Sequence, residues 1–146
     1  MDTLTIDRAT QIGRVLESIV TLSRALARPR MTPFGDVVLT RTQLDILFVL
    51  AHATEPVAPG RLAATVKVTP GAITQTMDQL RDQHLVEQSP SDLDGRGRVW
   101  RLTDAAATQI GAFEAAMVLR TTPWFTSLSP DELDTLVALI SQVEVA

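Results

Sequence analysis

The stretch "TPGAITQTMDQLRDQHLVEQSPSDLDGRGRVWRLTD", residues 69–104, changes its periodicity halfway, and this change decides the fold. Thr69 is a favoured N-cap and Pro70 occupies the first helical position, so a helix is expected to begin here. Past "QH" the pattern predicts two short strands, "LVEQ" and "RVWRL", joined by a loop. The apolar residues of the first half are spaced i, i+4 and i+7 and form an inward stripe: Ile73, Met77 and Leu80.

The opposite face of this predicted helix is short and mostly polar, whereas an ordinary solvated face would be rich in Lys and Glu. The members of the opposite face are Gly71, Thr74, Gln75, Asp78, Gln79 and Arg81.

Upstream of this stretch, the sequence predicts three more helices. Residues 6–28 carry apolar positions in steps of three and four, and Pro29 stops that helix. Thr40 and Gln43 form a capping box at the start of the next helix, which precedes a short helix in "GRLAATVKV". The residues expected on the buried side of the second helix are Leu44, Leu47, Phe48 and Leu50.

Downstream, two helices follow the second strand. Thr103 caps one that runs to about Leu119, and Pro123 lies beyond its end. Ser129 and Glu132 form a second capping box, with proline between them at the first helical position, and open the last helix.

The order of these elements predicts a mainly α fold with a small β-hairpin (α+β), that is, a winged helix-turn-helix with terminal dimerisation helices. We expect one domain, 1–146, with a DNA-binding lobe at 40–103 and a helical dimerisation lobe from 1–39 and 104–146. The terminal helices carry more apolar surface than a small winged core can cover, so a homodimer is expected. Its predicted interface residues are Leu16, Leu119, Trp124, Leu133, Leu136 and Ile140.

Composition narrows the classes of protein to consider. The chain has 146 residues, a net charge of −4 and no cysteine, which excludes disulfides and thiolate chemistry. Net charges of 0, +1 and −5 fall in residues 1–59, 60–101 and 102–146, so a local basic site in the middle is compatible with the acidic total. The polar start "MDTLTIDRAT" lacks signal-peptide features and no apolar run is long enough for a membrane span, so a cytoplasmic protein is expected.

The loop "SPSDLDGRG", residues 89–97, allows several interpretations. A calcium loop needs about five ligand positions and a closing Glu, which are missing here, and Arg96 and Arg98 would repel the cation. A phosphate cradle should open a helix, but a strand follows. A solvated hairpin tip and a DNA-binding wing remain. In the wing interpretation, Arg96 enters the minor groove, Asp94 orients its guanidinium, and Arg98 lies nearer the sugar-phosphate backbone.

The wing stretch resembles the signature of MarR-family transcriptional regulators, in which Asp, any residue and Arg precede Leu-Thr at a fixed distance. The resemblance implies a homodimeric winged-helix regulator, and a repressor released by a small, often phenolic, ligand is favoured. No residue marks the ligand pocket. Three residues depart from the family pattern. Gln75 stands where a basic residue is common in the family, so base preference is not transferable from relatives. His84 occupies a turn position where the family usually has glycine, and histidine enters the left-handed conformation less readily than glycine. Ala58 lacks the hydroxyl that often precedes the short helix. The residues that carry the resemblance are Asp94, Arg96, Leu102 and Thr103, with "LTRTQLDILFVLA" (39–51), "RLAATVKVTPGAITQTMDQLRDQHLVEQ" (61–88) and "LSPDELDTL" (128–136).

The expected partner is double-stranded DNA with a pseudo-palindromic operator, because a two-fold dimer reads two half-sites. Gln75 can pair with adenine and Thr74 can touch a thymine methyl, while Thr69 places the helix N-terminus on a phosphate. Arg61 and Lys67 are further candidates for phosphate contacts. The full set of predicted DNA-binding residues is Thr69, Gly71, Thr74, Gln75, Gln79, Asp94, Arg96 and Arg98.

Other function classes have weaker support. The two histidines, His52 and His84, have no carboxylate or cysteine at ligand spacing, and neither a metal nor a cofactor is expected. No catalytic motif is present, so an enzyme has no specific support. A winged-helix protein–protein module without DNA binding stays open, because the chain is acidic and the face of the DNA-contacting helix carries one arginine.

Overall fold

The computed structural model describes residues 3–27, 33–90 and 97–145 and divides the chain into two compact units. The first, Met1–Val37, is dominated by helix α1 (Thr3–Leu26). The second, Val38–Ala146, holds every other element. None of the helices in the described ranges combines the length and hydropathy that a membrane crossing requires.

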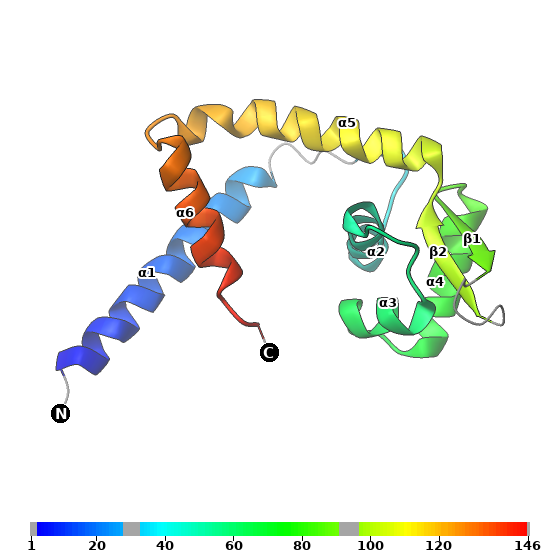
Figure 1. Cartoon of the computed structure of the whole chain (residues 1–146), viewed down its shortest axis with the longest axis horizontal. Helices are drawn as coiled ribbons and strands as arrows, with labels where there is room; N and C mark the ends of the chain where they lie inside the picture. Colours follow the sequence, from blue (N-terminus) through cyan, green and yellow to red (C-terminus); the bar gives the residue numbers. More distant parts are fainter. Residues whose placement is uncertain (1–2, 28–32, 91–96, 146) are drawn as a thin grey trace. The chain divides into compact units, whose positions relative to one another are not determined.

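The second unit has the predicted winged helix-turn-helix order and is mostly helical (Figure 1). Its two strands form one antiparallel hairpin beside α4, and α5 leads from the hairpin toward α6. The elements are α2 (Arg41–His52), α3 (Pro59–Val66), α4 (Pro70–Asp82), β1 (Val86–Pro90), β2 (Arg98–Leu102), α5 (Asp104–Thr121), the 3₁₀ turn η1 (Thr122–Phe125) and α6 (Pro130–Ser141).

All four predicted N-caps are confirmed. The side chains of Thr40, Thr69, Thr103 and Ser129 each accept a hydrogen bond from the backbone N–H three residues on. The boxes at the starts of α2 and α6 are complete, because the N3 side chain also accepts from the cap backbone. Local sequence therefore sets where these helices begin.

The buried side of α2 differs from the prediction. Leu47 and Leu50 are buried as expected, but Leu44 and Phe48 are only partly covered, and Ile46 is fully buried. The buried residues are Gln43 and those three, four and seven positions after it. This buried face is offset by one residue from the face that hydrophobicity alone indicates. Phe48 stacks on His52 at the edge of the core, with ring centroids 6.4 Å apart.

The hairpin is joined to the helices by backbone hydrogen bonds. Within it, Val86 pairs with Leu102 and Gln88 with Trp100. Val57, in the connection between α2 and α3, adds a bridge on the other side of β2: its N–H and carbonyl exchange two bonds of 2.8 Å with Trp100. The side chains of Val57 and Trp100 are both buried.

Thr103 joins three elements at the far end of the hairpin. His84, which ends the turn after α4, has φ of 60°, so this histidine adopts the left-handed conformation as its position predicts. The Thr103 hydroxyl donates to the His84 carbonyl at 2.9 Å and accepts from the Ala106 N–H at 3.2 Å. Its own N–H donates to the Leu85 carbonyl at 3.1 Å. One residue thus ties the end of α4, the end of β2 and the start of α5.

Replacing Thr103 with Ala should lower the free energy of unfolding by about 1–3 kcal/mol, because the cap and the bond to His84 are lost together. Urea unfolding followed by circular dichroism measures this as a lower midpoint with an unchanged slope. Thr108→Ala is the matched control, since that hydroxyl donates to the Asp104 carbonyl of its own helix. It should change stability by less than about 0.5 kcal/mol. Equal effects of the two variants would contradict the joining role of Thr103.

Candidate nucleic-acid interface

Helices α3 and α4 are held as a rigid pair with a tight turn between them. Lys67 caps α3 in the left-handed conformation, with φ of 57° and ψ of 50°, and its N–H donates to the Ala63 carbonyl. The Val68 N–H donates to the same carbonyl at 3.0 Å, and Thr69 then starts α4. The predicted inward stripe of α4 is confirmed, and it packs into the core with Leu62 of α3: Ile73, Met77 and Leu80 are all buried.

Because that stripe is buried, the opposite face of α4 is presented to solvent. Gly71, Thr74, Gln75 and Gln79 are all exposed on it. The Thr74 hydroxyl donates to the Pro70 carbonyl at 3.1 Å, which fixes its rotamer. Four of the eight predicted DNA-binding residues therefore share one exposed helix face, which begins at a fifth, the cap Thr69.

Gly71 is a notable member of this face. A Cβ placed at Gly71 would meet nothing within 4 Å apart from its chain neighbours and the backbone of its own helix, so internal packing does not require glycine there. Glycine also disfavours the helical state relative to alanine. Its presence near the start of α4 is consistent with close approach of a partner's backbone.

Arg81 of α4 is paired with two aspartates of the same helix. Arg81 lies 3.2 Å from Asp78 and 3.8 Å from Asp82, measured between side-chain nitrogen and oxygen atoms. All three side chains are about half exposed or more, so the pairs contribute little to stability.

In the hairpin, Arg98 is exposed and pairs with Pro90, the last residue of β1 before the loop. This is the tip end of the hairpin, as expected for a wing. Asp94 and Arg96 lie outside the described residues. Arg101 lies 2.5 Å from Glu87, directly opposite it in the strand register. This cross-strand ion pair was not predicted, because it depends on the register and not on the local pattern.

A second interaction missed by the sequence analysis reaches the exposed face of α4 from α2. The amide nitrogen of Gln43 donates to the side-chain oxygen of Gln79 at 3.2 Å. Gln43 was recognised only as a capping residue, and its spacing to Gln79 in the sequence carries no signal of contact. The structure thus links the start of α2 to a predicted DNA-binding residue.

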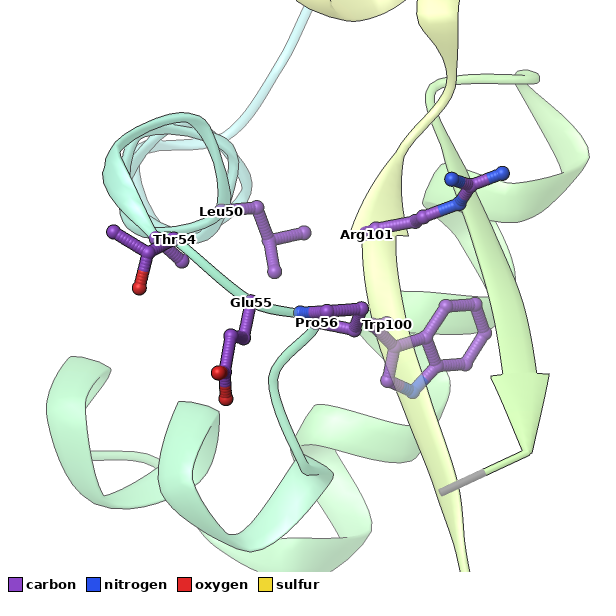
Figure 2. Close-up of a pocket in the computed structure, with 7 residues that line it drawn as sticks. Leu50, Thr54, Glu55, Pro56, Trp100 and Arg101 are labelled. Carbon is purple, nitrogen blue, oxygen red and sulfur yellow. The ribbon is translucent and has the colours of Figure 1, made fainter. Parts of the chain in front are cut away.

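A hollow of about 250 Å³ lies where the connection after α2 approaches β2. Figure 2 shows Glu55 and Pro56 on this connection, next to the strand that carries Trp100 and Arg101. The Arg101 guanidinium pairs with Glu87 on β1. Within the described residues, no three His, Cys, Asp or Glu side chains converge on a metal-binding position.

The far end of the second unit presents an apolar groove of about 550 Å³ between the end of α5, η1 and α6. Leu133, Leu136 and Ile140 line it. No residue of α6 is buried. The other predicted interface residues are also accessible: Leu119 is 76% exposed, Trp124 42% and Leu16, on α1, 56%.

Comparison with known proteins gives a consistent result. Residues 39–97 match the MarR family. The transcriptional regulator ZitR of Lactococcus lactis is 36% identical over 72 residues, which cover 49% of this chain and 48% of that protein, about half its length. A crystal structure of ZitR, described as a zinc-responsive MarR family member, is 25% identical with a TM-score of 0.52, over 91% of this chain and 94% of that one.

Two further solved structures share the fold. ZitR in complex with DNA is 24% identical, with a TM-score of 0.51, over 91% of this chain and 92% of that one. S. aureus MepR bound to ethidium bromide is 16% identical, with a TM-score of 0.64, over 86% of this chain and 91% of that one.

The open space around Gly71 leads to a two-part prediction. Gly71→Ala should raise stability by up to about 1 kcal/mol, because alanine favours the helix and meets no neighbour. It should nevertheless weaken binding to duplex DNA at least several-fold, because the methyl group intrudes on a close backbone approach. Gly60→Ala is the matched control for helix propensity, since Gly60 occupies the same position after the proline of α3 and is equally unobstructed. Unfolding midpoints and fluorescence anisotropy measure the two parts; wild-type DNA affinity in Gly71→Ala would refute the close approach.

Proposed function

We propose that this chain is a member of the MarR family of winged helix-turn-helix proteins and a homodimeric transcriptional regulator that binds double-stranded DNA. The observation that carries the proposal is the exposed face of α4. It is polar, built from short side chains, and held outward by a fully buried stripe on the opposite side. A helix of this kind fits the major groove, where base edges offer hydrogen-bond donors and acceptors.

In this proposal, the residues of α4 and the hairpin have separate roles. Gln75 and Thr74 contact base edges, the amide of Gln75 pairing with adenine and the methyl of Thr74 packing against thymine. The N-terminus of α4, capped by Thr69, lies on a phosphate. Arg96, oriented by Asp94, enters the minor groove from the wing, and Arg98 neutralises a backbone phosphate.

The proposed dimer is supported by apolar surface that the described chain leaves uncovered. Helix α6 buries none of its residues although Leu136, Val137 and Ile140 lie in one groove. Apolar patches of this kind on soluble proteins mark interaction sites. A second copy of the chain is the natural partner, because an isologous contact relates the two α4 helices by a two-fold axis. The operator should then be a pseudo-palindrome whose half-sites lie about one helical turn apart.

The direction of regulation is also part of the proposal. We favour a repressor that leaves its operator when a small aromatic ligand binds, and we place it in the cytoplasm with the DNA. The support is the family resemblance, together with the ethidium held by MepR, a protein of the same fold. Thermal-shift screening with small aromatic acids, followed by anisotropy of the DNA complex, tests this: hits that stabilise the protein should also release DNA.

Substitutions on α4 test the DNA contacts directly. Gln75→Ala and Thr74→Ala should each weaken binding to a selected operator, Gln75→Ala by about 1–3 kcal/mol with loss of preference at one base pair. Thr135→Ala on α6 is the matched control, because its hydroxyl also donates to its own helix, to the Asp131 carbonyl at 2.9 Å. Selection from random duplexes gives the operator, and anisotropy gives the affinities. Failure of the wild type to bind any duplex at low salt would instead support a protein–protein module.

A charge placed in the apolar groove tests the dimer. Ile140→Asp should convert the protein to a monomer at micromolar concentration, because burying an unpaired carboxylate costs several kcal/mol. Thr135→Asp adds the same charge to an exposed polar position of α6 and should leave the dimer intact. Sedimentation velocity distinguishes the two species. A wild-type protein that sediments as a monomer would contradict the proposed assembly.

A further inference from the structure

Gln43 is the one buried polar side chain in the described ranges, with 5% of its surface exposed. It lies at the third position of α2, and its role there as a capping residue uses only its oxygen. Its amide nitrogen lies 3.2 Å from the side-chain oxygen of Gln79, on the exposed face of α4. A buried amide is stable only when its polar atoms are satisfied, so this second bond is part of the reason that Gln43 is tolerated there.

The bond from the Thr40 backbone to Gln43 determines the direction of the bond between Gln43 and Gln79. The backbone N–H of Thr40 is always a donor, so the group facing it at 2.9 Å must be the Gln43 oxygen. The Gln43 nitrogen, a donor only, therefore faces α4. Whatever it meets must accept, which assigns the oxygen of Gln79 to the inner side. The amide nitrogen of Gln79 is then the end of the side chain that remains for a partner.

We propose that Gln43 is a positioning residue that fixes the polarity of Gln79, so that Gln79 meets DNA as a hydrogen-bond donor. This inference rests on the proposed function. A fixed donor selects an acceptor on the DNA: guanine N7 or O6, thymine O4, or a phosphate oxygen. It does not favour the two-point pairing with adenine, which also needs the glutamine oxygen. Gln75, which has the same side chain one turn earlier, is not proposed to be oriented in this way.

The choice of glutamine at position 43 is informative because glutamate would serve the cap equally well. A glutamate here would keep the bond from the Thr40 N–H and would favour the helix N-terminus through its charge. It would offer no donor to Gln79, however. The amide of Gln79 would have to turn and donate its nitrogen inward, and its oxygen would then face the DNA. Gln43→Glu thus reverses Gln79 without removing the cap.

The experiment is a double-mutant cycle of Gln43→Glu and Gln79→Ala, measured on stability and on DNA affinity. Gln43→Glu should still fold and unfold cooperatively, because its carboxylate keeps the bond from the Thr40 N–H and accepts one from the Gln79 amide, which offsets part of the cost of burying the charge. Its affinity for the wild-type operator should fall by about 5- to 10-fold, the size of one hydrogen bond. In the Gln79→Ala background, the same change should have less than a two-fold effect, because there is no amide left to reverse. Selection from random duplexes distinguishes a base edge from a phosphate as the acceptor. A changed base preference indicates a base edge, and an equal loss of affinity for all sequences indicates a phosphate.

A measurement on the free protein decides the polarity independently of DNA. In ¹⁵N spectra, hydrogen exchange of the Gln43 side-chain NH₂ should be protected in the wild type and that of Gln79 should not be. In Gln43→Glu the Gln79 NH₂ should become protected. The inference is overturned if Gln43→Glu weakens binding equally with and without Gln79, which would be an effect of charge alone, or if the Gln79 NH₂ is unchanged. A wild type that binds no duplex overturns the proposed function, while the exchange measurement still decides the polarity.

Discussion

The backbone pairing of Val57 with Trp100 is the constraint on which the winged arrangement depends. A two-stranded hairpin is marginally stable by itself, and these two hydrogen bonds of 2.8 Å give it a third backbone partner from the segment between α2 and α3. The pairing uses backbone atoms, while the two side chains fill the core on either side. These bonds attach the strand that carries Arg98 to the segment that leads into the helix-turn-helix.

The features that sequence predicted well are local ones. A cap such as Thr69 or Ser129 acts within three residues of itself, and the stripe through Ile73 and Met77 repeats at the helical period, so both are visible in a single line of sequence. The buried arc of α2 was misjudged because Phe48 is more hydrophobic than its position requires. What decides burial there is the location of the neighbouring helices, which periodicity within α2 does not encode.

The features that sequence missed join residues far apart in the chain. Glu87 and Arg101 meet only because the hairpin has a particular register, and Gln43 meets Gln79 only because the fold brings the start of α2 to α4. For the proposed interface on DNA, the outward positions of Thr74 and Gln75 followed from the stripe behind them. For the proposed dimer, the sequence showed an excess of apolar residues at both ends, but an excess does not identify which surfaces would meet. That pairing is a property of two chains and is absent from the pattern of one.

The ion pairs of Arg81 with Asp78 and Asp82 bear on how such a protein would search a genome. Attraction to any DNA comes mainly from cations that displace the counterions of phosphates, and it grows with the number of such contacts. A reading helix whose own arginine is already neutralised, on a chain of net charge −4, adds little to this attraction. The protein would spend less time held at irrelevant sequences and more time in free diffusion. Occupancy of the operator would then depend on fitting the bases, and competition from the bulk of the chromosome would be small.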